Sequence, residues 1–194
     1  MQPIVKYLLF LFLPIAEIHS TTANDTSLAT QAKNGLVLGA GGGLGILTTE
    51  YDANLYYYLG NRFVGVRYLE SREARFDVWG SFPRPLERIW QFDALVGAKA
   101  FNRDMTASIS MGIGLFGGTL RGRPLQNPDP EGYTQYEHLD QTTVAIPMEA
   151  RMAYTPTEYL ELGISGIANI NSKHTLLSLF VSFRVLFPFL SFAG

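Results

Sequence analysis

Hydrophobic and polar residues alternate with a period of two over most of the chain from Gly35 onward. Successive side chains of a β-strand point to opposite faces, so this spacing predicts strands rather than helices. Residues 105–117 illustrate it, because Met105, Ile109 and Ile113 share one face while Ser and Gly dominate the other. Segments of this kind are predicted at 36–47, 51–59, 63–71, 88–101, 105–117, 143–154, 159–169 and 175–187.

The lengths and connections of these segments indicate a membrane barrel. A tilted strand that crosses a bilayer needs about 9–11 residues, close to the length of most of the segments. Short turns, such as Gly60-Asn61, alternate with connections that are mostly longer, the largest being 72–87 and 118–142. Short turns on one rim and longer loops on the other are typical of bacterial outer-membrane barrels. The predicted fold is therefore all-β, an eight-stranded antiparallel up-and-down transmembrane β-barrel.

The position of the charges indicates which face meets lipid. A soluble barrel carries its charges outside, around an apolar lumen. Here the apolar face is bulky and nearly free of charge, whereas the opposite face is small or charged and fits a narrow lumen. We expect a structural network of salt bridges in that lumen, although an ion or proton path is an alternative role for the same residues. Its predicted members are Asp52, Arg67, Asp93, Lys99, Glu149, Arg151, Glu161 and Arg184.

Composition and motifs exclude several function classes. No basic run is present that could neutralise the phosphates of a nucleic acid, and there is no cysteine for a disulfide or a thiolate metal site. Residues 112–117 (GIGLFG) match a dinucleotide-binding spacing but lie within a period-two segment with no helix pattern behind them. His138 and His174 are the only histidines beyond the predicted export signal, and they do not form a paired metal-binding spacing. We therefore predict no cofactor and no metal site.

The N-terminus has the layout of a secretory signal peptide. Lys6 precedes the apolar run 7–16, and small or polar residues follow it, with a plausible cleavage site after Ala23. The apolar run is short for a membrane span, although a retained N-terminal anchor is the alternative interpretation. The predicted organisation is a signal peptide at 1–23, a flexible leader at 24–34 and an outer-membrane barrel domain at 35–194.

The strand pattern, together with turns such as YLGNRFVGVRY at 58–68, resembles the small outer-membrane barrel families typified by OmpA, OmpX and OmpW. The resemblance implies location in the outer membrane, contact with its lipid and lipopolysaccharide, and insertion by the outer-membrane machinery. Phe187 is the aromatic residue that closes the last strand. The resemblance also implies a non-enzymatic structural or surface-interaction role. The length of loops 72–87 and 118–142 makes them candidates for contact with an extracellular ligand, although 118–142 could equally be a surface loop that is merely tolerated.

Three alternatives compete with this interpretation. A lipid A-modifying enzyme resembling the deacylases would need a His-x-Ser pair, but His138 is followed two residues later by Asp140 and His174 by Leu176. A soluble periplasmic lipocalin-like barrel would need the opposite distribution of charge. An inner-membrane helical anchor at 176–192 conflicts with the period-two pattern and with Pro188.

Overall fold

A computed structural model describes residues 34–45, 48–73, 86–102, 104–125, 134–172 and 175–188. The predicted signal peptide at 1–23, and all but the last residue of the predicted leader, lie outside this range. The strands are β1 (Gly35–Gly45), β2 (Thr48–Leu59), β3 (Arg62–Glu73), β4 (Arg88–Asn102), β5 (Met105–Pro124), β6 (Tyr136–Thr157), β7 (Leu160–Asn171) and β8 (Leu176–Pro188). Within the described ranges, no helix is long and apolar enough to cross a membrane.

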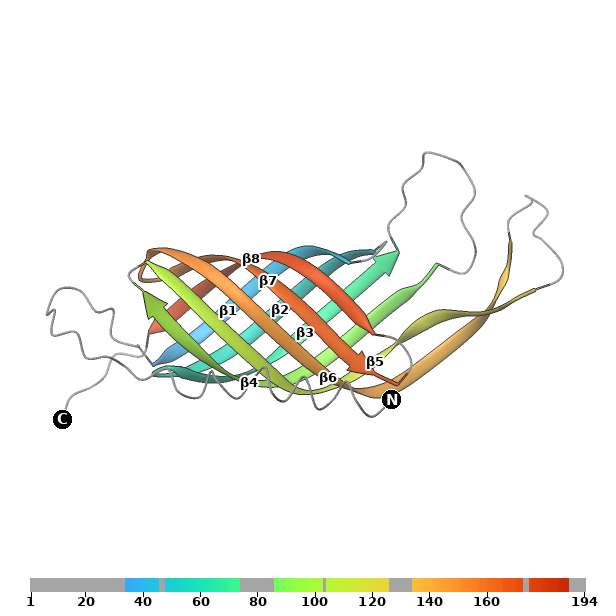
Figure 1. The fold of residues 1–194 in the computed structure, drawn as a ribbon, viewed down its shortest axis with the longest axis horizontal. Coiled ribbons are helices and arrows are strands. Elements are labelled where there is room, and N and C mark those ends of the chain that lie inside the picture. Colours follow the sequence, from blue (N-terminus) through green and yellow to red (C-terminus); the bar gives the residue numbers. More distant parts are fainter. Residues whose placement is uncertain are drawn as a thin grey trace, which may run out of the picture.

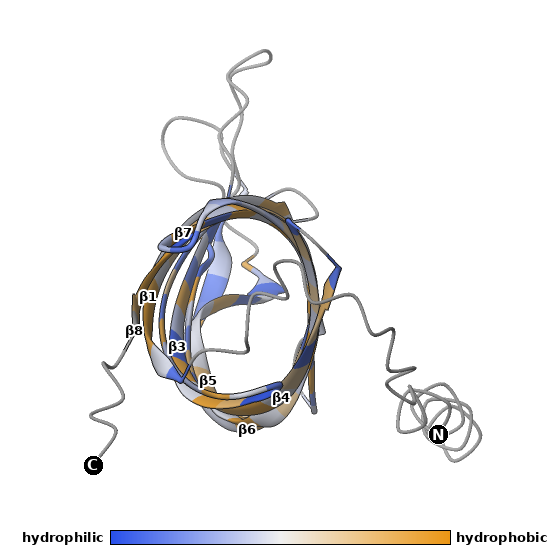
Figure 2. Ribbon diagram, turned by 90° about the vertical axis from the view of Figure 1, so that its left-hand side faces the viewer, coloured by the Kyte–Doolittle hydropathy of each residue, from blue (hydrophilic) through white to orange (hydrophobic). Residues whose placement is uncertain are grey.

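The eight strands form one closed barrel. Each pairs antiparallel with its neighbours in sequence, and β1 closes the ring against β8 from Gly35↔Pro188 to Gly45↔Ser178. The side view and the end-on view both show the closed wall of tilted strands (Figures 1 and 2). The structure confirms the predicted eight-stranded antiparallel barrel.

The two faces of the wall have opposite chemistry. Aliphatic side chains point outward and remain exposed, including Val181 at 69% and Met152 at 64%, whereas Arg67 is only 1% exposed inside. A soluble lipocalin-like barrel would require the reverse arrangement. The helical-anchor alternative also fails, because residues 176–188 form β8. Such an apolar outer surface is stable only when lipid covers it.

Aromatic side chains lie toward both ends of this apolar surface. On the rim that carries the long loops, the outward rings of Tyr68 and Phe92 contact each other at a tilt of 51°, with centroids 4.9 Å apart, and Trp90 packs edge-on against Phe92 at 6.3 Å. On the opposite rim, Tyr154 and Phe187 are about half exposed. These are the positions that the rings of interfacial aromatic residues occupy in membrane barrels.

The largest difference from the sequence prediction concerns residues 118–142, which were expected to be a loop. Here β5 continues to Pro124 and β6 begins at Tyr136, and the two strands pair beyond the barrel wall. Figure 1 shows this hairpin projecting past the neighbouring strands. Leu120 still packs in the lumen with Ile89, Phe116 and Ala145. Beyond it the clear alternation fades, because neither face meets lipid or a packed lumen. The other long connection is shorter than predicted, since β3 extends to Glu73, and residues 74–85 lie outside the described range.

The outward face should tolerate a charge near its rim but not in its middle. We expect Val181→Arg, in the middle of β8, to cost about 2–4 kcal/mol of folding free energy in lipid, and Leu177→Arg, near the loop-side end of the same strand, about 0–1 kcal/mol. Both native side chains point outward, at 69% and 58% exposure. Urea titration of folding in lipid vesicles measures the difference. Equal stability of the two variants would contradict the assignment of β8 as a membrane-spanning strand.

Candidate functional site: the charged lumen and the outer rim

Four of the predicted lumen residues form one continuous ion-pair network. Arg67 on β3 lies 2.7 Å from Asp93 on β4 and 3.2 Å from Glu149 on β6. Glu149 also lies 3.0 Å from Arg184 on β8 and accepts a hydrogen bond from the Tyr56 hydroxyl at 3.3 Å. The network therefore ties together residues of five strands, joining the consecutive β2, β3 and β4 to β6 and β8 across the lumen. All of its members are buried, so each charge depends on its partners.

A second pair lies on neighbouring strands. Arg151 Nη1 on β6 donates to Glu161 Oε2 on β7 at 2.9 Å. Glycine makes room for this arginine, because a Cβ on Gly163 would lie 2.6 Å from the Arg151 guanidinium. In the same way, a Cβ on Gly39 would lie 2.6 Å from Cγ of Arg184. The small inward residues therefore leave the space in the lumen that the long charged side chains occupy.

The remaining two predicted residues face the lumen without forming an ion pair within the described part of the chain. Asp52 accepts a hydrogen bond from Asn54 Nδ2 at 2.6 Å. The Lys99 ammonium lies over the Tyr58 ring, 3.3 Å from its centroid, so a cation–π contact takes the place of a carboxylate. The expected balance of four acids against four bases is therefore only partly realised as ion pairs.

Sequence reasoning missed one buried acid, Glu50. It was assigned to the connection 48–50, but β2 begins at Thr48 and places Glu50 inside, at 1% exposure. Its carboxylate accepts hydrogen bonds from Thr48 at 2.9 Å and Ser71 at 3.3 Å. Its even number, shared with Asp52 and Asn54, was the signal for an inward position.

Apolar side chains pack in the lumen on both sides of the main network. Along β3 the inward residues run from Phe63 near the short-turn end through Arg67 to Leu69 near the loops. Phe63 belongs to a buried cluster with Val37, Tyr56, Tyr58 and Leu95. Leu69 belongs to another, with Ile167, Leu176 and Phe180. Along β3, Arg67 of the main network therefore lies between two apolar clusters, and these clusters fill part of the lumen.

The projecting hairpin brings one histidine close to an acid and a hydroxyl. His138 Nε2 lies 3.0 Å from Asp140 Oδ1 and 3.4 Å from Thr119 Oγ1, and Thr119 donates to the same Asp140 oxygen at 3.0 Å. A nucleophilic relay needs the acid on one ring nitrogen and the hydroxyl on the other. Here a single nitrogen faces both groups, and the His138 and Asp140 side chains are 56% and 78% exposed. This arrangement is that of a solvated surface cluster.

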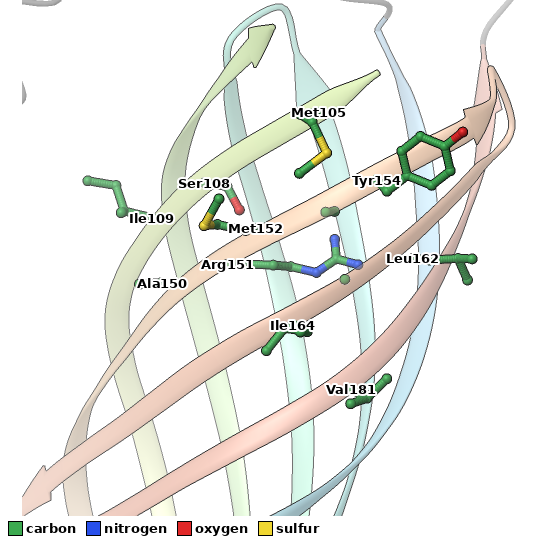
Figure 3. A pocket seen from close by; sticks show the side chains of 12 residues that line it. Met105, Ser108, Ile109, Ala150, Arg151, Met152, Tyr154, Leu162, Ile164 and Val181 are labelled. Carbon is green, nitrogen blue, oxygen red and sulfur yellow. The ribbon is translucent and has the colours of Figure 1, made fainter. Parts of the chain in front are cut away.

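A shallow groove of about 770 Å³ lies on the outer face over β5, β6, β7 and β8. Met105, Met152, Leu162 and Val181 line it together with the small Ala150 (Figure 3). Its walls are almost entirely apolar and lie on the face that meets lipid, so it is a depression for hydrocarbon chains rather than a polar site. Across the described residues, no group of three or more His, Asp or Glu side chains is placed to hold a metal ion.

Comparison with solved structures places the fold among small outer-membrane barrels. Neisserial surface protein A superposes with a TM-score of 0.59 at 11% identity, covering 78% of this chain and 96% of that one. The N-terminal β-barrel domain of Pseudomonas aeruginosa OprF gives 0.54 at 14% identity, covering 81% and 100%. Ail, the attachment invasion locus protein of Yersinia pestis, gives 0.52 at 8% identity, covering 81% and 99%. No family model and no curated protein matches the sequence.

Loss of the central acid should destabilise the barrel strongly. Glu149→Gln removes the carboxylate that Arg67 and Arg184 share, and breaking a buried ion pair in this way costs about 3–5 kcal/mol. The matched control is Glu137→Gln on the exposed part of β6, where we expect a change of about 0–0.5 kcal/mol. Urea unfolding of both variants in lipid vesicles gives the comparison. If Glu149→Gln is as stable as the control, the network does not hold the barrel together.

Proposed function

We propose that the protein is a non-enzymatic outer-membrane barrel that acts at the cell surface through its β5–β6 hairpin. The observation that carries the proposal is the continuation of these two strands as a paired ribbon beyond the wall. Strand β4 begins at Arg88, opposite Thr119, and β7 ends at Asn171, opposite Ala145. Residues 120–124 and 136–144 therefore extend past their neighbours on both sides.

Specific contacts hold the base of this ribbon. Arg121 pairs with Glu73 of β3, and its backbone N–H donates to the Glu87 carboxylate at 3.2 Å. Farther out, Leu125 N–H donates to the Gln135 carbonyl at 2.8 Å. An isolated two-stranded ribbon is only marginally stable in water, so this anchoring positions it against the barrel. A ribbon held in this way presents a defined surface rather than a loose loop, which favours binding over mere tolerance of an insertion.

The exposed edge of β6 suggests how a partner would bind. From Tyr136 to Val144 this strand has no β7 partner, and the connection between β7 and β8 is only four residues long. An unpaired strand edge offers backbone donors and acceptors to an incoming extended segment. Exposed Leu139 and Leu125 add apolar contacts on the ribbon. The proposed partner is therefore a surface or matrix molecule that contacts the ribbon directly.

The location and remaining partners belong to the same proposal. We infer export through the signal peptide at 1–23, insertion by the outer-membrane machinery and contact with lipopolysaccharide in the outer leaflet. The even number of strands places both barrel ends on the short-turn rim, which would face the periplasm, while the hairpin would face outward. The fold, the lipid-facing surface and the leader pattern support this orientation. The connection that includes residues 74–85 would form part of the same extracellular surface.

Shortening the hairpin tests the surface role. Leu120 and Leu139 are register partners, so residues 121–138 can be replaced by Asn-Gly, the preferred two-residue hairpin turn. We expect cells that carry this variant to lose adhesion to immobilised extracellular-matrix proteins, which can supply an extended segment to the edge of β6.

The control keeps the hairpin and changes the opposite rim by inserting two glycines at the Gly60-Asn61 turn. Both proteins must show the faster gel migration of a folded barrel before heating. Adhesion should remain with the turn variant and disappear with the shortened hairpin. Equal adhesion by wild-type cells and by cells with the shortened hairpin would contradict the proposal.

A further inference from the structure

On the outer face of two neighbouring strands, the side chains change from apolar to charged at the same register. Outward residues of β3 run Val66, Tyr68, Glu70 and Arg72 toward the loops, and those of β4 run Ala94, Phe92, Trp90 and Arg88. Arg72 and Arg88 are register partners, directly beyond the pair Glu70 and Trp90. Because aromatic residues mark the interface of a bilayer, the two arginines lie at the level of the lipid headgroups.

The two arginines share a single acid. Arg72 Nε and Arg88 Nε both donate to Oε1 of Glu70, at 2.7 and 2.8 Å. The arginine side chains are 56% and 63% exposed, whereas that of Glu70 is 15% exposed. Their terminal guanidinium nitrogens have no other hydrogen-bond partner among the described residues. One acid holds two guanidinium groups side by side, leaving one net positive charge and free donors that suit a phosphate.

A polar hollow of about 320 Å³ adjoins this pair on the side of β5 and β6. Arg88, Trp90, Thr119, Asp140 and Thr142 contribute to its lining. Trp90 lies flat against the wall there, because a Cβ on Gly117 would be 2.4 Å from its ring. Asp140 and the threonine hydroxyls are acceptors for hydroxyl donors. Asp140 also repels phosphate, so a ligand that carries both groups would place its phosphate at the arginines and its hydroxyls toward Asp140.

We propose that this surface, formed by Arg72, Arg88, Trp90, Thr119 and Asp140, binds the phosphorylated sugar headgroup of an outer-leaflet glycolipid. The inference rests on the proposed lipopolysaccharide partner and adds the site that would hold it. A phosphate meets the guanidinium pair, the sugar occupies the hollow, and the acyl chains run down over the aromatic and aliphatic surface below. The site does not include residues 121–138, the part of the hairpin beyond the pair Leu120 and Leu139.

The test measures lipid binding to the folded full-length protein in detergent by native mass spectrometry. The probes are diphosphorylated lipid A, the same lipid A without phosphates, and phosphatidylglycerol. We expect wild type to bind the diphosphorylated form at least about tenfold more tightly than either other lipid. Arg72→Gln/Arg88→Gln should remove most of that preference, and Asp140→Asn should narrow the preference over phosphatidylglycerol.

The matched control is Arg62→Gln, which removes an exposed arginine of β3 at the opposite rim and should leave the affinity within about twofold. A similar loss with Arg62→Gln would overturn the site, because the attraction would then be diffuse. If the double variant does not fold, the site can still be tested by the affinity of Arg88→Gln and of the wild type for the three lipids. If the folded arginine variants keep the preference for phosphorylated lipid A, this site is refuted, but the proposal that lipopolysaccharide is a partner is not. No such preference in wild type would refute both.

Discussion

The rest of this structure depends on the pairing of β1 with β8. A bilayer offers no water to satisfy backbone polar groups, so a sheet can cross it only when it has no open edge. The register from Gly35↔Pro188 to Gly45↔Ser178 removes the last two edges and joins the first strand to the last. Closure then fixes an inside and an outside for every strand, and the alternating sequence fills them with opposite chemistry.

A narrow closed wall also determines what the lumen can be. Eight strands enclose little more than their own side chains, so charged residues inside must find partners across the barrel rather than water. Arg67, Glu149 and Arg184 do so from three different strands, and buried apolar layers lie on both sides of them. Packed and ion-paired side chains consequently occupy the lumen. Binding chemistry is left to the rim and to the projecting hairpin, the parts that neither lipid nor lumen constrains.

Period-two alternation was sufficient to predict the eight strands and the inward face of the eight charged residues named from it, because inward and outward positions follow directly from odd and even numbering. Glu50 was missed because the strand that carries it was predicted to begin only at Tyr51. It could not predict which charges pair. That depends on register around the barrel, which is why Lys99 faces Tyr58 and Asp52 faces Asn54. The hairpin beyond Leu120 was missed because water meets both of its faces and no alternation is required there. Thr119 was missed as a neighbour of His138 and Asp140, since only strand pairing brings it to residues so distant in sequence.

The central claim is that the odd-numbered residues of β8 face lipid while the even-numbered residues face a packed lumen. The chain contains no cysteine, so single cysteines at each position from 177 to 183 can carry a spin label without further changes. Accessibility to oxygen, which concentrates in hydrocarbon, should be measured for each labelled protein in lipid vesicles. It should peak at Leu177, Leu179, Val181 and Phe183 and fall at the residues between them. Peaks at the even positions, or a repeat of three to four residues, would contradict the barrel described here.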